Sequence, residues 1–523
     1  MERSGITRRQ FVGTGLRAGL AVAGAGMLGA TLERGVASAA PVAPYPQITL
    51  PSRPHGHWSY VTRPDLTPPR LSISTTPGFP YSSEQPKYIF CAPRSDLGGP
   101  YPAGAGQGPL ITTLTGEVVW FNPIPASEGG PFNFRVQTYQ SNPSAKKTSV
   151  LTWFQGKFSD IGISSSGNGV ILKDDYSQMA TVEAGPYQID LHELLLTDQG
   201  TAMVAAYVPN VKVSGGTIYV GHAVEVDISS GEVKWDWPCY PHVSRSDSMV
   251  STTGDYFHLN SIDIWPGSPR NVLVSGRNVS TVYLIDRLTN KILWRVGGGK
   301  RSTFKMGTNS PFYFQHDARA LADGSGISVF DDASQPSPEK NSSGKVITLD
   351  PSNKTATLRH QYFHTDRATD TPREGNVQLL PNGGHVVGWG STPYMSELRA
   401  SGNAMNAELI LDARFPANVE SYRWFMFDWS ANPPQSELRA VVRPTGGSGH
   451  YTAWVSWNGA TKVAAWRLSA GPSSHSMEVI TTVAKHSFET AINFTRNGTQ
   501  AVRIAALDAA GRVLTRTSVI SPS

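Results

Sequence analysis

The sequence predicts an all-β protein, a six-bladed β-propeller followed by a small immunoglobulin- or fibronectin-like β-sandwich. The first observation behind this prediction is a repeat. Segments that start at His192, His258 and His316 and run into an apolar strand are 66 and 58 residues apart, and a segment of the same shape follows at Asn376. A period near 60 residues in a strand-rich chain indicates a repeated sheet module.

A second repeat runs in step with the first. Residues 227–235 form a predicted strand, a tight polar turn and a strand that ends in Trp235, and residues 286–294 and, more loosely, 350–358 repeat this pattern. Such strand-turn-strand units are the building blocks of propeller blades. The 51 glycines and 38 prolines suit many short strands joined by turns, and the number of modules predicts six blades.

At 523 residues the chain is too long for one compact core, so we expect several parts. Residues 40–86 are rich in Pro, Ser and Thr and predict an extended N-terminal arm. Residues 87–432 carry the propeller pattern. Beyond Asn432, short alternating strands about ten residues apart predict a β-sandwich over residues 436–523.

The first 39 residues predict a twin-arginine signal peptide. Thr7–Val12 contains the paired arginines, residues 16–32 form a mildly apolar run, and Ala37–Ala39 fits a cleavage site. A membrane-spanning or buried helix is the alternative, but the run is rich in Gly and Ala and contains Arg17. We therefore expect export to the cell envelope or medium, with no stable membrane insertion after removal of the signal.

Charge and cysteine content narrow the function classes. The formal charge is only +5, and Lys and Arg are scattered, so nucleic-acid binding is not expected. Cys91 and Cys239 are the only cysteines. An exported protein allows a disulfide between them, and two isolated buried thiols are the alternative, because sequence does not place the two sulfurs within bonding distance.

The three repeated histidines are the candidate functional residues. Polar residues at matching blade positions converge on the axis of a propeller, so His192, His258 and His316 are expected to meet there. Each histidine alone would more often cap a strand or bond a neighbouring blade. A three-histidine metal site is a further alternative. We predict no metal, because each histidine is flanked by residues suited to holding its ring.

These motifs, taken in order, resemble the bacterial arylsulfotransferase family, in particular its secreted actinobacterial and fungal branch. The resemblance covers residue 87 to near the C-terminus. The segments that carry it are Asp190–Glu193, Asp255–Ser261, Ser275–Asn278, Trp294–Gly298, Gln315–Arg319, Phe330–Asp332, Gly375–Gln378, Gly388–Gly390, Ser421–Arg423 and Ser456–Thr461.

The resemblance implies transfer of a sulfuryl group from a phenolic sulfate ester to a phenolic acceptor, without a cofactor and without PAPS, through a histidine that is transiently sulfated. His258 and His316 match the two axial histidines of the enzymes and are expected to serve as nucleophile and acid/base, with His192 beside them. The residues expected to orient these rings or to contact the substrate are Asn260, Asp317, Asn376, Arg319, Arg277 and Glu193.

One position departs from the family pattern. In the enterobacterial-type enzymes the sulfated histidine lies on the blade after the Gln-His-Asp blade, where this chain has Asn376. An amide forms no stable sulfated intermediate, so the nucleophile would have to be His258, His316 or His192. The alternative function is a non-catalytic secreted propeller that binds cell-wall glycan or another surface ligand. A quinone-dependent dehydrogenase and a histidine-based hydrolase or lyase are further rivals.

Overall fold

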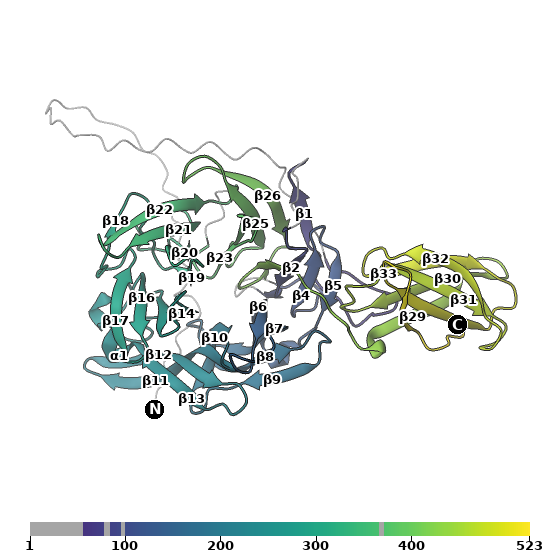
Figure 1. The fold of residues 1–523 in the computed structure, drawn as a ribbon, viewed down its shortest axis with the longest axis horizontal. Coiled ribbons are helices and arrows are strands. Elements are labelled where there is room, and N and C mark those ends of the chain that lie inside the picture. Colours follow the sequence, from purple (N-terminus) through teal and green to yellow (C-terminus); the bar gives the residue numbers. More distant parts are fainter. Residues whose placement is uncertain (1–55, 78–83, 96–99, 366–370, 523) are drawn as a thin grey trace, which may run out of the picture. The chain divides into compact units, whose positions relative to one another are not determined.

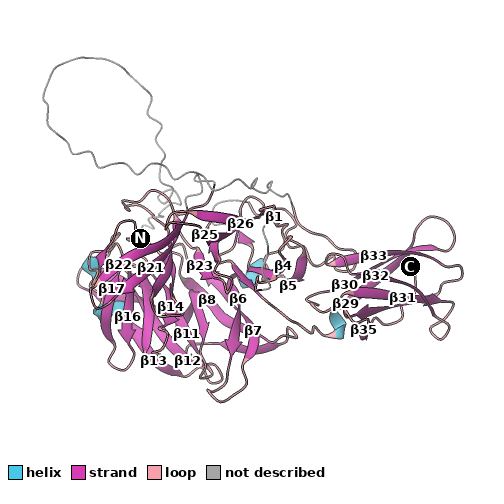
Figure 2. Cartoon of the chain, turned by 45° about the horizontal axis from the view of Figure 1, so that its top comes forward, coloured by secondary structure: helices cyan, strands magenta, loops and turns pink. Residues whose placement is uncertain are grey.

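The computed structural model describes residues 56–77, 84–95, 100–365 and 371–522. Nearly all regular structure in these residues is β-strand (Figure 2), so the prediction of an all-β chain is confirmed. The predicted signal peptide, residues 1–39, lies outside the described residues. Among those described, no helix has the length and apolar character that crossing a membrane requires.

Six sheets, counted over the described residues and antiparallel apart from one parallel pair at an outer edge, are arranged as a ring (Figure 1). The first sheet contains β6 (Gly130–Tyr139), β7 (Thr148–Phe158), β8 (Ser164–Leu172) and β9 (Gln178–Val182). The second contains β10 (Gln188–Leu196), β11 (Thr201–Val213), β12 (Gly216–Asp227) and β13 (Val233–Pro238). The third contains β14 (Leu259–Ile264), β15 (Asn271–Gly276), β16 (Thr281–Asp286) and β17 (Lys291–Val296).

The next two sheets gain a fifth strand at the outer edge. The fourth contains β19 (His316–Ala320), β20 (Gly326–Asp331), β21 (Ser343–Asp350), β22 (Thr355–Tyr362) and β18 (Lys305–Met306). The fifth contains β23 (Asn376–Leu379), β24 (His385–Gly388), β25 (Tyr394–Ala400), β26 (Ala407–Arg414) and β1 (Ser72–Thr75). The strand β1 comes from the segment predicted as an arm.

The sixth sheet joins the two ends of the ring. Its order is β28 (Phe425–Phe427), β2 (Tyr88–Cys91), β4 (Leu110–Thr113) and β5 (Val118–Phe121). A short pair, β3 (Arg94–Ser95) with β27 (Val419–Glu420), repeats this connection. The inner strand of the sheet therefore comes from the end of the propeller sequence and the other three strands from its beginning.

Short turns join the outer strands, and aspartates fix three of them. Asp227, Asp286 and Asp350 end β12, β16 and β21, and one side-chain oxygen of each accepts a hydrogen bond from the backbone N–H two residues later, at 2.9–3.0 Å. This is the Asx-turn geometry that favours Asp before a tight turn. The repeated turn pattern of the sequence corresponds to these three hairpins.

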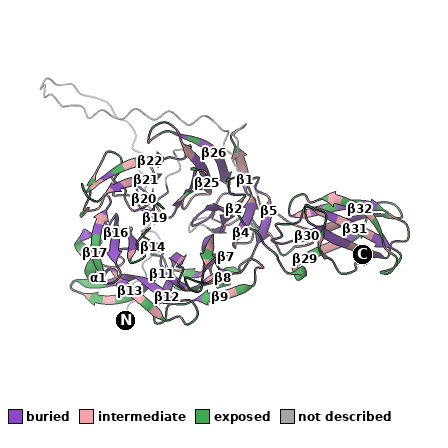
Figure 3. Ribbon diagram, in the orientation of Figure 1, coloured by how far each residue is buried: buried purple, intermediate pink, exposed green. Residues whose placement is uncertain are grey.

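Apolar side chains fill the spaces between neighbouring sheets, so the inner strands are mostly buried (Figure 3). One cluster, for example, joins Tyr207 of β11 and Ala223 of β12 to Ile262 of β14 and Val274 of β15. The two cysteines belong to such clusters. Cys91 and Cys239 are both buried and free, which is the second of the two arrangements that the sequence left open.

Polar side chains on the inner strands bind the backbone of the next sheet. Asn376 of β23 donates to the carbonyl oxygen of Trp424 at 2.7 Å and accepts from its N–H at 2.9 Å. Gln378 repeats the pattern with Met426 at 2.9 and 2.8 Å. These pairs continue the hydrogen-bonding of one sheet into its neighbour and fix the register between them.

Residues after Asn432 form two further sheets. One contains β29 (Leu438–Pro444), β30 (His450–Trp457) and β33 (Glu489–Thr495), and the other β32 (Glu478–Ala484), β31 (Ala465–Gly471), β34 (Ala501–Leu507) and β35 (Val513–Arg516). Their facing side chains, among them Trp466, Leu468 and Ile504, form one apolar core. Four short helical segments complete the described elements, η1 (Ala126–Glu128), α1 (Cys239–His242), η2 (Arg245–Asp247) and η3 (Gln435–Glu437).

The pairing of Asn376 with Trp424 predicts a stability effect. The Asn376→Ala change leaves a buried N–H and a buried carbonyl without partners, each costing about 1–3 kcal/mol. We expect the free energy of unfolding in urea to fall by about 2 to 4 kcal/mol. Leu379→Ala, at an exposed position of the same strand, is the matched control and should change it by about 0.5 kcal/mol or less. Equal midpoints of urea unfolding for the Asn376→Ala and Leu379→Ala variants would contradict the assigned role of Asn376.

Candidate functional site

Three histidine rings meet where neighbouring inner strands face the centre of the ring. His192 lies within β10, His258 directly precedes β14, and His316 begins β19. The ring centroids of His192 and His258 are 4.7 Å apart, and that of His316 lies 6.3 and 6.4 Å from them. The three residues are only 3, 8 and 1% exposed. The structure thus brings the three histidines singled out in the sequence into one cluster, called here the histidine triad.

Local irregularities of the backbone direct these side chains inward. The strand pairing of the second, third and fourth sheets shifts register at or just beyond each histidine, between Ile189 and Leu194, between Leu259 and Ser261, and between His316 and Arg319. Such bulges re-aim a side chain at the end of a strand. His258 also has a left-handed backbone conformation, with φ of 53°, which is uncommon outside glycine and is found at functional sites.

Carboxylates from the local sequence hold two of the rings. The Nδ1 atom of His192 bonds Asp190, whose other oxygen accepts from the backbone N–H of Ser164 at 2.6 Å. The Nδ1 atom of His258 bonds Asp255 at 2.5 Å. A carboxylate that accepts the Nδ1–H fixes both the ring orientation and the tautomer, so the Nε2 atom keeps its lone pair.

A carboxylate from the next strand holds the third ring. The Nδ1 atom of His316 lies 2.9 Å from Asp332, which directly follows β20, and Nε of Arg277 lies 3.5 Å from the same carboxylate. Burial lowers the pKa of His316 well below its usual value, and Arg277 lowers it further. Burial also raises the pKa of Asp332, while Arg277 opposes that shift. Burial and Arg277 together favour the neutral imidazole.

On each ring, Nε2 is the nitrogen that the carboxylate does not bind. The Nε2 atoms of His192 and His258 are 3.2 Å apart, and all three ligand-type nitrogens lie within 4.8 Å of one another. The ring of Tyr422 lies beside them, with its centroid 5.8 Å from that of His192 and 6.4 Å from that of His316. Its hydroxyl is buried and has no hydrogen-bond partner among the described residues. The cluster is therefore buried, rich in imidazole nitrogen and bordered by a phenol.

A second buried cluster, the ionic layer, consists of Glu193, Asp317, Arg135, Arg319 and Arg423. The carboxylate of Glu193 lies 3.0 Å from Arg135, 2.5 Å from Arg319 and 3.5 Å from Arg423. Asp317 bonds Arg319 at 2.7 Å and Arg423 at 3.2 Å. Although burial raises the pKa of Glu193, the three arginines lower it to about 2, so this carboxylate stays charged.

The triad and the ionic layer are adjacent in sequence as well as in space. His192 precedes Glu193, His316 precedes Asp317, and Tyr422 precedes Arg423. The backbone is irregular at these places, since Asp317 has a left-handed φ of 51° and Tyr422 lies in a bend outside the strands, and this irregular backbone directs neighbouring side chains to different clusters. The same three short segments thus supply one member to each cluster, and the ion pairs fix the backbone that carries the rings.

The other residues expected at the site lie elsewhere or have other partners. Asn260 donates to the carbonyl oxygen of Gln315 at 2.6 Å, and Asn376 binds Trp424 in the same manner. Asp317, Glu193 and Arg319 belong to the ionic layer and form no hydrogen bond with a triad ring among the described residues. Of the two arginines, Arg277 lies at the triad.

Sequence reasoning missed the carboxylates that bind the rings. Asp190 and Asp255 stand two and three residues before their histidines, which is a signal that the motifs contained. Asp332 is 16 residues from His316 in sequence and reaches it because β20 pairs with β19. Tyr422 was part of a quoted motif, but only the fold places its ring against the histidines.

The comparison with protein families agrees with this geometry. The sequence profile described as arylsulfotransferase (ASST) matches residues 144–409, half of the chain, and this range includes all three histidines of the triad. The chain belongs to the arylsulfotransferase family. No curated protein matches it.

Solved structures similar to this arylsulfotransferase-family chain share little sequence with it. A hypothetical selenium-binding protein from Sulfolobus tokodaii is 9% identical with a TM-score of 0.36, over 84% of this chain and 97% of its own. A putative 6-phosphogluconolactonase from Bacteroides fragilis is 10% identical with a TM-score of 0.35, over 67 and 100%. The β-propeller domain of Myceliophteria thermophila Cps50 (Swd1) is 9% identical with a TM-score of 0.33, over 73 and 96%. Similarities at this level assign no activity to the chain.

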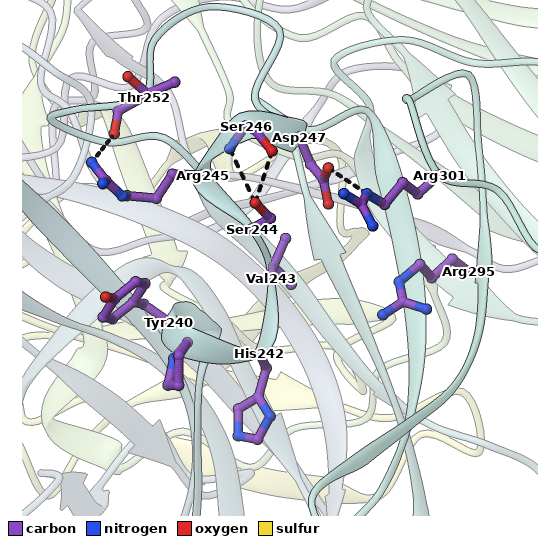
Figure 4. Close-up of a pocket in the computed structure, with 11 residues that line it drawn as sticks. Tyr240, His242, Val243, Ser244, Arg245, Ser246, Asp247, Thr252, Arg295 and Arg301 are labelled. Carbon is purple, nitrogen blue, oxygen red and sulfur yellow. Dashed lines mark hydrogen bonds and ion pairs between the residues drawn. The ribbon is translucent and has the colours of Figure 1, made fainter. Parts of the chain in front are cut away.

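A surface pocket of about 650 Å³ lies apart from the triad, at α1 and η2 (Figure 4). Arginines line much of it. Arg301 is paired with Asp247 at 2.7 Å, and Arg245 donates to the carbonyl oxygen of Thr252 at 3.0 Å. None of the three triad histidines lines this pocket. His242 is the histidine that lines it, so the pocket and the triad are separate features of the described residues.

The ionic layer predicts that replacing Glu193 lowers the free energy of unfolding strongly. The Glu193→Gln change leaves three buried arginines facing a neutral side chain, and removing one partner of a buried ion pair costs about 3–5 kcal/mol. We expect the free energy of unfolding in urea to fall by that amount. Glu232→Gln, in an exposed pair with Lys234, is the control and should cost less than about 1 kcal/mol. A Glu193 variant as stable as this control would contradict the role given to the layer.

Proposed function

We propose that this protein transfers a sulfuryl group from a phenolic sulfate ester to a phenolic acceptor at the histidine triad, without a nucleotide sulfate donor. The observation that carries the proposal is the set of three buried imidazoles in an arylsulfotransferase-family chain, each bound through Nδ1 to a carboxylate. This arrangement leaves an Nε2 lone pair on each ring, and the three rings offer ligand-type nitrogens within 4.8 Å of one another. A neutral imidazole of this kind is a nucleophile as well as a proton acceptor.

His316 is the proposed nucleophile, because its Nε2 atom has no hydrogen-bond partner among the described residues and burial favours its neutral form. Its Nε2 attacks the sulfur of the donor, an N–S bond forms, and the S–O bond to the phenol breaks. For this step the Nε2 atoms of His192 and His258, 3.2 Å apart, hold one shared proton, and the leaving phenolate takes it. In the second step the acceptor phenol gives its proton to that pair, its oxygen attacks sulfur, and the N–S bond breaks.

Arg277 is the proposed contact for the sulfuryl oxygens. Its guanidinium lies at the triad, 3.5 Å from Asp332, whereas Arg319 is engaged by Glu193 and Asp317. A cation beside the developing charge stabilises the transition state for group transfer. In this assignment Asn376 takes no part in chemistry, and its side chain serves the contact between two sheets.

We also propose that the chain is exported by the twin-arginine pathway and acts in the cell envelope or outside the cell. The support is the paired-arginine segment at Thr7–Val12 with the apolar run and small-residue site that follow it. Its test is the location of the protein in the parent cell before and after Arg8 and Arg9 are both replaced by Lys. Retention of the double variant in the cytoplasm is the expected result, and unchanged export would contradict this proposal.

Turnover of 4-nitrophenyl sulfate by the full chain tests the reaction. We expect release of 4-nitrophenol to depend on added phenol, with phenyl sulfate as the second product. His316→Gln and His258→Gln should lower this rate by about 10²- to 10⁴-fold, because each removes a nucleophile or proton carrier. His475→Gln, at an exposed position of the sandwich, should leave it unchanged.

The controls separate the rival functions. Near-ultraviolet circular dichroism of each variant shows whether its tertiary packing is retained, so that a lost rate reports chemistry rather than unfolding. Release of 4-nitrophenol without phenol would indicate a sulfatase. Absence of turnover by the folded unsubstituted chain, across several aryl sulfates and phenols, would sink the transferase proposal in favour of a binding propeller.

A further inference from the structure

The distance between two ring nitrogens of the triad requires an explanation. The Nε2 atoms of His192 and His258 are 3.2 Å apart, while the Nδ1 atom of each ring is bound to a carboxylate. When both Nδ1–H groups are donated, the two Nε2 atoms are both acceptors, and two lone pairs in contact repel each other. A cation between them removes this repulsion, either a proton or a metal ion.

The position of the third ring, that of His316, favours a metal ion over a proton shared by His192 and His258. All three ligand-type nitrogens lie within 4.8 Å of one another, and Nε2 of His316 has no hydrogen-bond partner among the described residues. A tetrahedral ion with bonds of 2.0–2.1 Å holds two nitrogens about 3.3 Å apart. The pair at 3.2 Å matches this spacing, and His316 has to approach by on the order of 1 Å.

The groups behind the rings also fit a metal centre. Histidines that bind metals usually donate their second N–H to a carboxylate, and Asp190, Asp255 and Asp332 accept from the three rings in this way. The sequence interpretation argued against a metal because residues flanking each histidine are suited to holding its ring. In the structure three carboxylates hold the rings through Nδ1, and this arrangement leaves Nε2 for an ion.

The charged groups around the triad also favour a metal ion. Three carboxylates surround the rings, and Arg277 is the cation that lies against one of them. The other arginines nearby, Arg319 and Arg423, are paired with Glu193 and Asp317. Asp190 and Asp255 form no ion pair with an arginine among the described residues, and their negative charge beside the rings favours a divalent cation.

We infer that His192, His258 and His316 bind a divalent first-row transition-metal ion through their Nε2 atoms. Imidazole ligands suit Zn²⁺, Cu²⁺, Fe²⁺ and Ni²⁺, and three protein ligands leave a fourth position for water or substrate. This inference does not depend on sulfuryl transfer. It does have a consequence for it, because an ion that engages all three Nε2 lone pairs leaves no imidazole nucleophile, so the loaded triad is expected to be inactive in the histidine reaction.

Metal titration of the full chain, without a histidine tag and after removal of bound metal with a chelator, tests the site. Co²⁺ is the probe, because its visible absorption bands report tetrahedral nitrogen ligation. We expect binding of one ion per chain and its displacement by Zn²⁺. His192→Gln and His316→Gln should abolish the absorption, Asp332→Asn should weaken binding by about 10- to 100-fold, and His475→Gln should behave as the unsubstituted chain.

The outcomes are distinct. Folded protein that binds no Co²⁺, or binds it equally well in the triad variants and in His475→Gln, overturns the inference. Phenol-dependent turnover by the metal-free chain, tested on the same samples, decides the proposed function independently. Loss of that turnover on adding Zn²⁺, with recovery on chelation, supports both. Turnover only with metal supports the metal site and overturns the role of His316 as nucleophile.

Discussion

The ion pairs of Glu193 are the constraint on which the centre of the molecule depends. Its carboxylate lies on β10 and contacts arginines from three other parts of the ring, Arg135 on β6, Arg319 on β19 and Arg423 just before β28. An ion pair buried this deeply is favourable only when its geometry is well satisfied, so it tolerates few relative positions of the sheets. The layer therefore restricts the relative positions of these four segments at the centre of the ring.

This constraint acts directly on the chemistry, because the residues of the ionic layer and of the triad alternate along the same backbone. His192 cannot move without Glu193, nor His316 without Asp317, since each pair shares a peptide unit. The backbone that carries the triad is held by ion pairs on its other side, so the rings of the triad are preorganised. Preorganised groups do not have to rearrange when the reaction takes place, which makes their stabilisation of the transition state more effective.

The repeat in the sequence predicted the class of fold and the meeting of the three histidines, because both follow from a period shared by successive modules. It did not predict which partner each ring has. Asp317 stands beside His316 in sequence, yet its side chain points to the other cluster, and the carboxylate at the ring is Asp332 from the next strand. Bulges at each histidine decide this, and a bulge has no periodic signal. Asn376 is a second example. It stands at the position where the repeat would place a fourth histidine, yet its amide binds the backbone of the neighbouring sheet.

The sixth sheet gives the chain a definite order of assembly. Its inner strand, Phe425–Phe427, is synthesised more than three hundred residues after its partner, Tyr88–Cys91. Until that late segment leaves the ribosome, one edge of β2 has no neighbour, and an open strand edge is a template for pairing with another chain. Contacts of such long sequence separation are also slow to form. The nascent protein is therefore most exposed to misassembly, and most in need of protection by chaperones, over the whole interval between these two strands.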